Sequence, residues 1–149
     1  AESRLRLELE SGSRIISLPA SEATIRGFAA VDLLVIDEAA RVADDLYHAV
    51  RPMLAVSRGR LVALSTPFGR RGWWSDAWHS GHDWQRVEIP ADHCLRIDPA
   101  FLAEERAQLG DWWYRQEYFC QFLDSQTALF TNDDIERMFA NPDMEIWEL

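Results

Sequence analysis

Alternating and apolar runs predict the strands in the first half of the chain. Leucines at every second position across residues 5–9 predict a strand, or an arm that belongs to a larger context, and residues 11–13 predict a turn after it. The short run Arg14–Leu18 predicts a second strand. Two further runs, Val31–Ile36 and Arg60–Leu64, are apolar without alternation. Runs of this kind are typical of strands that are buried on both faces of a parallel sheet.

A helical pattern lies between the last two strands. Apolar residues recur at three- and four-residue spacings from Ala39 to Met53, and Pro52 predicts an end or a kink there. Strand, helix and strand in this order form the βαβ unit of a parallel α/β sheet. The chain is therefore predicted to have an α/β fold in which helices flank a parallel sheet.

The second half of the chain is predicted to be mainly helical. A short aromatic helix is expected at Trp73–His79, and the alternation of Trp84–Ile89 predicts an edge strand. Three further helices are expected, one from an Asp98 cap to the stop at Gly110, one over Asp111–Phe122 and one over Asp133–Ala140 with Asn132 as its cap. The break at residues 90–98 separates a sheet-containing part, 1–90, from a helical part, 91–149.

The charged residues exclude two kinds of chemistry. The 149 residues include 15 basic and 25 acidic side chains, which give a formal net charge of −10. All 15 basic side chains are arginine, so no lysine is present to form a Schiff base or to hold phosphates in a GxxxxGK[ST] loop. The acidic balance also argues against a chain that binds nucleic acid on its own.

Hydrophobicity and cysteine content indicate a globular domain. Hydrophobic residues make up 48% of the chain, and no apolar run is long enough to cross a bilayer. The two cysteines are too few for a disulfide scaffold, and the first residues carry no secretion signal pattern. We therefore expect no membrane segment and a reducing, cytosolic location.

Two strand ends carry the candidate chemistry. The run Val31–Ile36 is followed by Asp37 and Glu38, and ligands bind at this edge of open parallel sheets. In P-loop ATPases an Asp at this place helps to hold Mg²⁺ and the adjacent Glu activates the attacking water. The next strand ends in Ser65 and Thr66, whose hydroxyls are suited to sense the γ-phosphate. Each pattern also fits an ordinary strand end, since acids favour the start of a following helix and Ser, Thr and Pro favour turns.

Four segments together resemble the large subunit of tailed-phage DNA-packaging terminases. They are RIISLPASEATIRGF (14–28), VDLLVIDEAARV (31–42), AVRPMLAVSRGRLVALSTPFGRRGWW (49–74) and LGDWWYRQEYFCQFLD (109–124). The resemblance covers nearly the whole chain in the order of the family. It implies a partial RecA-like P-loop NTPase fold, in which residues 1–90 carry the Walker B and coupling motifs. Residues 91–149 would then be a helical linker toward an RNase H-like nuclease domain that the chain lacks.

The resemblance assigns roles to individual residues. Asp37 resembles the Walker B ligand of Mg²⁺ and the nucleotide, and Glu38 resembles the catalytic glutamate. Ser65, Thr66 and Pro67 resemble the coupling motif, and Ser65 and Thr66 are expected at the nucleotide. Arg26 resembles a loop arginine that is expected to reach the γ-phosphate in a neighbouring subunit. The alternative for Arg26 is a salt bridge within its own subunit.

Cofactors and partners also follow from the resemblance. In the intact parent, a motor of a phage or prophage in the cytoplasm of the bacterial host, ATP and Mg²⁺ are the expected cofactors. Double-stranded DNA, the small terminase subunit and the portal are the expected partners. The chain itself has no Walker A loop, so it is expected to bind no nucleotide tightly and to be inactive alone. An unpaired sheet edge would favour a homo-oligomer.

Two other interpretations stay open at this point. A non-catalytic terminase remnant would act as an interaction module for another protein. A helicase-like ATPase fragment would carry a similar pair of strand ends, although the helix predicted after Glu38 and the tryptophan-rich tail do not fit it.

The remaining clusters are interpreted as structural. The tryptophan clusters at 73–78 and 112–114 are expected to pack in the core, with base stacking as the alternative. Cys120 lies among aromatic residues and is also expected in the core. The acids at 133–136 fit the start of a helix. One set of histidines and a cysteine lacks the spacing of a familiar zinc site: His79, His82, His93 and Cys94.

Overall fold

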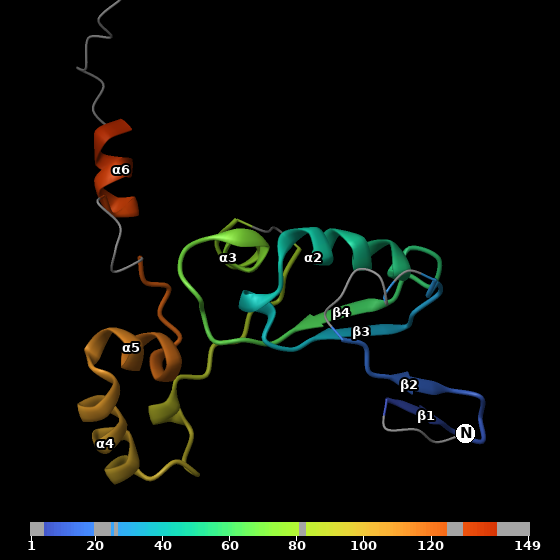
Figure 1. Cartoon of the computed structure of the whole chain (residues 1–149), viewed down its shortest axis with the longest axis horizontal. Helices are drawn as coiled ribbons and strands as arrows, with labels where there is room; N and C mark the ends of the chain where they lie inside the picture. The colour runs from blue at the N-terminus through green and yellow to red at the C-terminus, as the bar shows by residue number, and fades with distance from the viewer. Residues whose placement is uncertain (1–4, 20–24, 26, 81–82, 125–129, 140–149) are drawn as a thin grey trace, which may run out of the picture. The chain divides into compact units, whose positions relative to one another are not determined.

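The computed structural model describes residues 5–19, 25, 27–80, 83–124 and 130–139 (Figure 1). The chain divides into two compact units. Unit 1 comprises Ala1–Ser65 and Gly72–Ala77, and unit 2 comprises Thr66–Arg71 and Trp78–Leu149. The assignment of residues 1–90 to an ATPase core and 91–149 to a linker stays a prediction.

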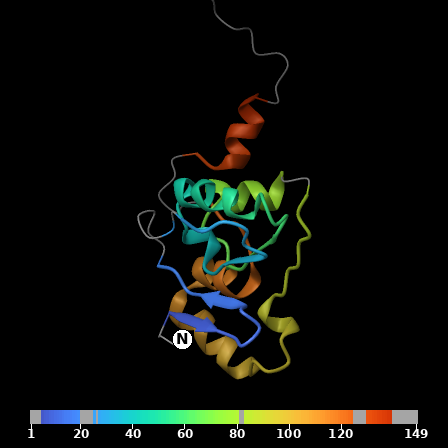
Figure 2. The ribbon, with the colours of Figure 1, turned by 90° about the vertical axis from the view of Figure 1, so that its right-hand side faces the viewer.

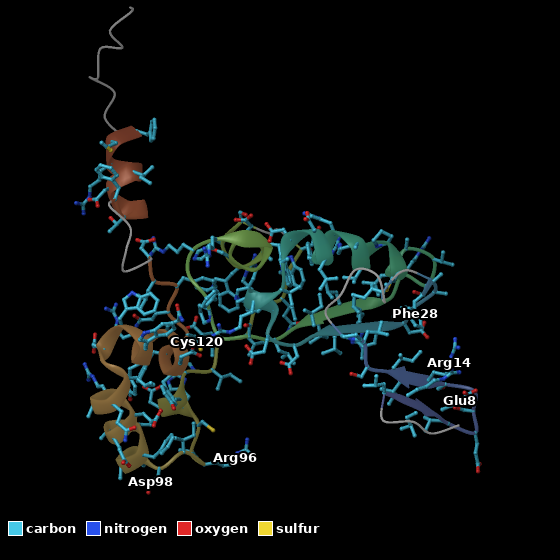
Figure 3. All side chains as sticks on the ribbon, in the orientation of Figure 1. Glu8, Arg14, Phe28, Arg96, Asp98 and Cys120 are labelled. Atoms are coloured by element: carbon cyan, nitrogen blue, oxygen red, sulfur yellow. The ribbon has the colours of Figure 1, made fainter. Side chains whose placement is uncertain are left out.

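An antiparallel hairpin begins unit 1. Strand β1, Arg6–Glu8, pairs with strand β2, Arg14–Ile16, and Glu8 lies opposite Arg14 (Figure 3). Gly12 has a φ of +83° in the connection, a conformation that glycine reaches without steric cost. The two strands and the turn predicted from the leucine alternation are therefore confirmed, although each strand is shorter than predicted.

Strands β3, Leu33–Ile36, and β4, Arg60–Ala63, form a parallel pair (Figure 1). The Arg60 N–H donates to the Asp32 carbonyl and the Leu64 N–H donates to the Ile36 carbonyl, each at 2.9 Å. Both strands come from the two apolar runs, and a helix lies in the connection between them. The predicted βαβ unit is therefore confirmed.

One face of this pair is covered and the other is exposed. Leu34 and Ile36 pack against a core that includes Val50 and Met53, from the connection between the strands. Figures 1 and 2 show helix α2 along that face. Leu33 and Val35 alternate with the covered residues and are each 51% exposed. The predicted burial on both faces is wrong for the described residues, because these strands are covered on one side only.

The connection between β3 and β4 is not the single helix that its spacing predicted. It consists of three elements, the 3₁₀ helix η1 over Ala39–Arg41, the α-helix α2 over Asp44–Val50 and the 3₁₀ helix η2 over Arg51–Leu54. Val42 and Ala43 are extended, with ψ values of 129° and 146°, and they interrupt the helix after η1. Pro52, where an end or a kink was predicted, lies in the first turn of η2, where a proline is tolerated, just after α2 ends at Val50.

The backbone before β4 passes close to the backbone before β3. The Ser57 hydroxyl donates to the Val31 carbonyl at 2.6 Å. A Cβ at Gly59 would collide with the same carbonyl oxygen. Glycine at this position therefore lets the chain pass the start of β3 as it enters β4.

Helix α3, Gly72–His79, begins against α2. The Trp73 N–H donates to Asp44 Oδ1 at 2.8 Å, and the Trp73 indole N–H donates to the Val42 carbonyl at 3.1 Å. The Tyr47 ring stacks on the Trp73 ring with centroids 4.0 Å apart. Trp73 is buried, so the predicted core packing of this residue is confirmed.

Unit 2 contains the short 3₁₀ helix η3, Ala91–His93, and the helices α4, Pro99–Leu109, and α5, Asp111–Phe119. Asp98 lies at the start of α4 (Figure 3) and accepts a hydrogen bond from the Ala100 N–H at 2.9 Å. The predicted cap is therefore confirmed.

The ends and packing of these helices follow from a few residues. Gly110, with a φ of +78°, separates α4 from α5, as predicted. Cys120 adopts the left-handed conformation and ends α5 before the predicted end at Phe122. Leu102 and Tyr114 are buried together and form the core of the helix pair.

Two predictions in unit 2 are corrected. Trp84–Ile89 forms no strand in the described structure, since alternating polarity does not make a strand where no neighbouring strand pairs with it. Helix α6 spans Asn132–Phe139, one residue earlier than predicted. Its cap is Thr131, whose Oγ1 accepts from the Asp134 N–H at 3.1 Å. Across the described ranges no helix is long and apolar enough to span a membrane.

Candidate active site

Asp37 and Glu38 lie at the carboxyl end of β3, as predicted from the sequence. The Glu38 N–H donates to Asp37 Oδ1 at 3.0 Å. Glu38 has a φ of 51° and a ψ of 41°, which turns the chain sharply into η1. A residue other than glycine in this left-handed region costs about 1–3 kcal/mol, and such residues gather at functional sites. Residues 37–41 are called the acidic turn from here on.

A hydrogen bond to Ser65 connects the acidic turn to the end of β4. Its Oγ accepts a hydrogen bond from the Ala40 N–H at 3.1 Å, across 25 residues of sequence. The Ala39 N–H donates to the Leu64 carbonyl at 2.9 Å, and Ala39 is fully buried. The structure therefore brings the acidic turn and Ser65 together. A serine hydroxyl that accepts one hydrogen bond keeps its own proton to donate.

Thr66 makes its hydrogen bond to a different element. Its Oγ1 donates to Glu117 Oε2 at 2.9 Å, and both residues are half-buried in unit 2. The second carboxylate oxygen of Glu117 accepts from Gln116 Nε2 at a longer 3.4 Å. Glu117 was missed in the sequence analysis, because a glutamate on a helix gives no local signal of a partner 51 residues away.

Arg41 is a basic neighbour of Glu38 that the sequence analysis also missed. Its Nε lies 3.7 Å from Glu38 Oε2, three residues along the acidic turn. The i,i+3 spacing of an acid and a base was the available signal. Both side chains are largely exposed, so the pair adds about 0–1 kcal/mol of stability. Arg26 lies outside the described residues, and its predicted role stays a prediction.

The acidic turn fits Mg²⁺ as one part of a coordination shell. Mg²⁺ is held in proteins by one or two carboxylates, with substrate phosphates and water as further ligands. Asp37 and Glu38 offer exposed carboxylate oxygens of this kind. Within the described residues, no group of three or more His, Cys, Asp or Glu side chains is placed to hold a metal. Phosphate or water oxygens would therefore have to complete the shell.

Comparison with known families decides which proteins this chain is related to. Residues 1–137 match the family model described as terminase large subunit, T4likevirus-type, N-terminal. The chain belongs to the terminase large-subunit family. The matched range includes the acidic turn and Ser65–Thr66 of this terminase chain. No curated protein matches it.

This terminase chain shares its fold with a solved structure. It is similar to the large terminase ATPase domain of Thermus phage P74-26, with a TM-score of 0.53 and 22% identity over 77% of this chain and 55% of that one. An arginine-to-alanine mutant of that domain matches with a TM-score of 0.47 and 23% identity, over 65% of this chain and 46% of that one. The chain thus spans about half the length of these structures. The predicted α/β fold is confirmed, and it is similar to the fold of that ATPase domain.

Proposed function

We propose that this terminase chain supplies the hydrolytic half of an ATPase site in a phage DNA-packaging motor. The hydrogen bond from the Ala40 N–H to Ser65 Oγ carries this proposal, because it ties the two predicted motifs into one edge of the sheet. The carboxyl edge of a parallel sheet is where ligands bind in folds of this class.

Each residue of the edge has a role suited to its chemistry. The exposed Glu38 carboxylate accepts the proton of the water that attacks the γ-phosphate. Asp37 helps to hold Mg²⁺, which neutralises developing charge on the phosphates when it is bound. The Ser65 hydroxyl holds the acidic turn and donates its own proton toward the phosphate or the water.

The phosphate-binding half of the site has to come from another segment. The chain contains no lysine, so it cannot supply the P-loop lysine that contacts the β- and γ-phosphates. We infer that the chain alone hydrolyses no ATP, and that it acts with a P-loop-bearing part of a terminase large subunit. In the motor the proposed partners are double-stranded DNA, the small terminase subunit and the portal, in the cytoplasm of the host.

Addition of the missing part tests this proposal. The chain is mixed or co-expressed with a P-loop-bearing terminase segment, and phosphate release from Mg-ATP is measured. The expected result is turnover by the mixture only, which Glu38→Gln lowers by at least about a hundredfold, the scale of general-base catalysis. Glu10→Gln, which removes the same charge from the exposed turn after β1, is the matched control and is expected to leave turnover unchanged.

Arg26 is proposed to act on the nucleotide of a neighbouring subunit. This role rests on the sequence resemblance, and an arginine supplied in this way is worth about 10³–10⁵ in rate in other NTPases. Mixed assemblies of Arg26→Ala and Glu38→Gln chains distinguish the alternatives. Activity that returns on mixing supports action between subunits, whereas additive loss supports a salt bridge within one subunit.

A second candidate function, a non-catalytic interaction module, is favoured by the open face of the β3–β4 pair. Four apolar side chains there are each 40–52% exposed: Leu33, Val35, Val62 and Leu64. Such a row favours self-association. Light scattering across a concentration series tests it. Dimers that persist in the presence of the P-loop-bearing segment, without ATP turnover, would favour the interaction module.

A further inference from the structure

The peptide bond between Ser65 and Thr66 joins two sets of contacts. Ser65 belongs to unit 1, where its hydroxyl holds the Ala40 N–H of the acidic turn. Thr66 belongs to unit 2, where its hydroxyl donates to Glu117. The division between the two compact units therefore falls within the motif that was predicted to couple hydrolysis to movement.

The backbone after this peptide bond is restrained. Pro67 is buried, and a residue that precedes proline is confined to extended conformations. The Arg70 Nε donates to the Phe122 carbonyl at 3.2 Å, just beyond the end of α5. Thr66–Arg71 is thus fastened in unit 2 at two points, Thr66 to Glu117 and Arg70 to Phe122. The backbone of this segment is therefore restrained within unit 2.

Glu117 is itself held in place by the helix pair. The neighbouring Gln116 is completely buried, and its amide donates to Glu117 Oε1. On the next residue, the Tyr118 hydroxyl donates to Glu105 Oε2 of α4 at 2.8 Å. A hydrogen bond from a hydroxyl to a charged carboxylate is stronger than one between two neutral groups. The hydrogen bond from Thr66 to Glu117 is therefore a firm restraint.

We propose that Glu117 is a positioning residue for the ATPase edge: through the Thr66 hydroxyl it sets the backbone at Ser65 and thereby the conformation of the acidic turn. This inference rests on the proposed function for its catalytic consequence. Its structural consequence is that a change on α5 alters the hydrogen bond from the Ala40 N–H to Ser65 Oγ. This consequence can be measured whether or not the chain has ATPase activity.

Amide hydrogen exchange on the whole chain tests the structural consequence. Ser65→Ala removes the acceptor directly and defines the rate of an unprotected Ala40 N–H. Glu117→Ala is expected to speed exchange at Ala40 about tenfold, the scale set by loss of one hydrogen bond. Thr66→Val, which keeps the size of the side chain, is expected to do the same. Glu117→Gln retains an acceptor for Thr66 and is expected to restore most of the protection.

The matched control is Glu104→Gln, which changes an exposed carboxylate of α4 that bonds to Gln108 and not to Thr66. It is expected to leave exchange at Ala40 unchanged. The proposal is overturned if Ala40 exchanges at the wild-type rate in Thr66→Val while Ser65→Ala accelerates it. Thr66→Val serves as the deciding variant if Glu117→Ala fails to fold.

Turnover in the mixture with the P-loop-bearing segment tests the catalytic consequence. Glu117→Ala is expected to lower kcat about tenfold to a hundredfold with little change in the KM for ATP, because misplacement of reacting groups affects the chemical step. Full kcat in Glu117→Ala contradicts the positioning role. An unaffected Glu38→Gln variant contradicts the proposed function instead, so the two failures are distinct.

Discussion

The Ser65 hydroxyl, at the end of β4, accepts a hydrogen bond at 3.1 Å from the backbone N–H of Ala40, which lies in the turn after β3. This bond makes the geometry of the acidic turn depend on a side chain of the adjacent strand. A ligand that forms a hydrogen bond with the Ser65 hydroxyl would therefore also affect the turn that carries Asp37 and Glu38.

Removal of this hydroxyl is expected to loosen the acidic turn. Ser65→Ala should lower the free energy of unfolding by about 1 kcal/mol, since it leaves the Ala40 N–H of a half-buried segment without its acceptor. Urea denaturation measures the change. Ser11→Ala removes a hydroxyl from the exposed hairpin turn and should change stability by less than about 0.5 kcal/mol. Equal stability of the two variants would contradict the role assigned to Ser65.

Gly59 is expected to tolerate no side chain. Gly59→Ala places a Cβ against the Val31 carbonyl oxygen, and forced packing of this kind costs about 1–3 kcal/mol. Thermal or urea unfolding gives the value. Val56→Ala, in the same connection but 78% exposed, is the control and should stay within about 0.5 kcal/mol of wild type. A neutral Gly59→Ala would show that the connection relaxes away from β3.

The start of α6 is expected to respond to acid. Hydrogen bonds from the Thr131 hydroxyl and N–H to Asp134 hold the pKa of that carboxyl below its ordinary value. A lowered pKa in the folded state means that the contribution to stability is present above the unfolded pKa and is lost as the pH falls through the lowered one. NMR titration of the Asp134 carboxyl should show that Thr131→Ala returns its pKa toward normal. Thr131→Ser, which keeps the hydroxyl, should not; an equal effect of both would contradict the cap.

Tyr118 is expected to respond to alkali in the opposite sense. Its hydrogen bond to Glu105, together with burial and nearby negative charge, raises the pKa of its hydroxyl above the ordinary value. The stabilisation is complete below the unfolded pKa of tyrosine and is lost as the pH rises through the raised one. Ultraviolet titration of tyrosinate should show that Glu105→Gln lowers this pKa. Glu104→Gln, next along α4, should leave it unchanged.

Local patterns predicted the elements that depend on neighbours in sequence. The apolar runs predicted β3 and β4, and the Asp98 cap with Gly110 predicted both ends of α4. The strand predicted at Trp84–Ile89 was wrong, because a strand also requires a partner that alternation does not report.

The residues of the candidate site also divide into those that a local pattern predicts and those that depend on a distant partner. Asp37, Glu38 and Ser65 were found from the strand ends that carry them, because parallel strands bring their carboxyl ends to one edge. Glu117 could not be found, since its bond to Thr66 depends on how α5 packs in unit 2. The exposure of Leu33 and Val35 was missed because an apolar strand shows no sign of which face will be covered.

The most direct test of this account is phosphate release from Mg-ATP by the chain combined with a P-loop-bearing terminase segment. We predict no turnover by the chain alone, turnover in the mixture, and its loss in Glu38→Gln but not in Glu10→Gln. Turnover that Glu38→Gln leaves intact would contradict the assignment of the acidic turn as the hydrolytic half of the site.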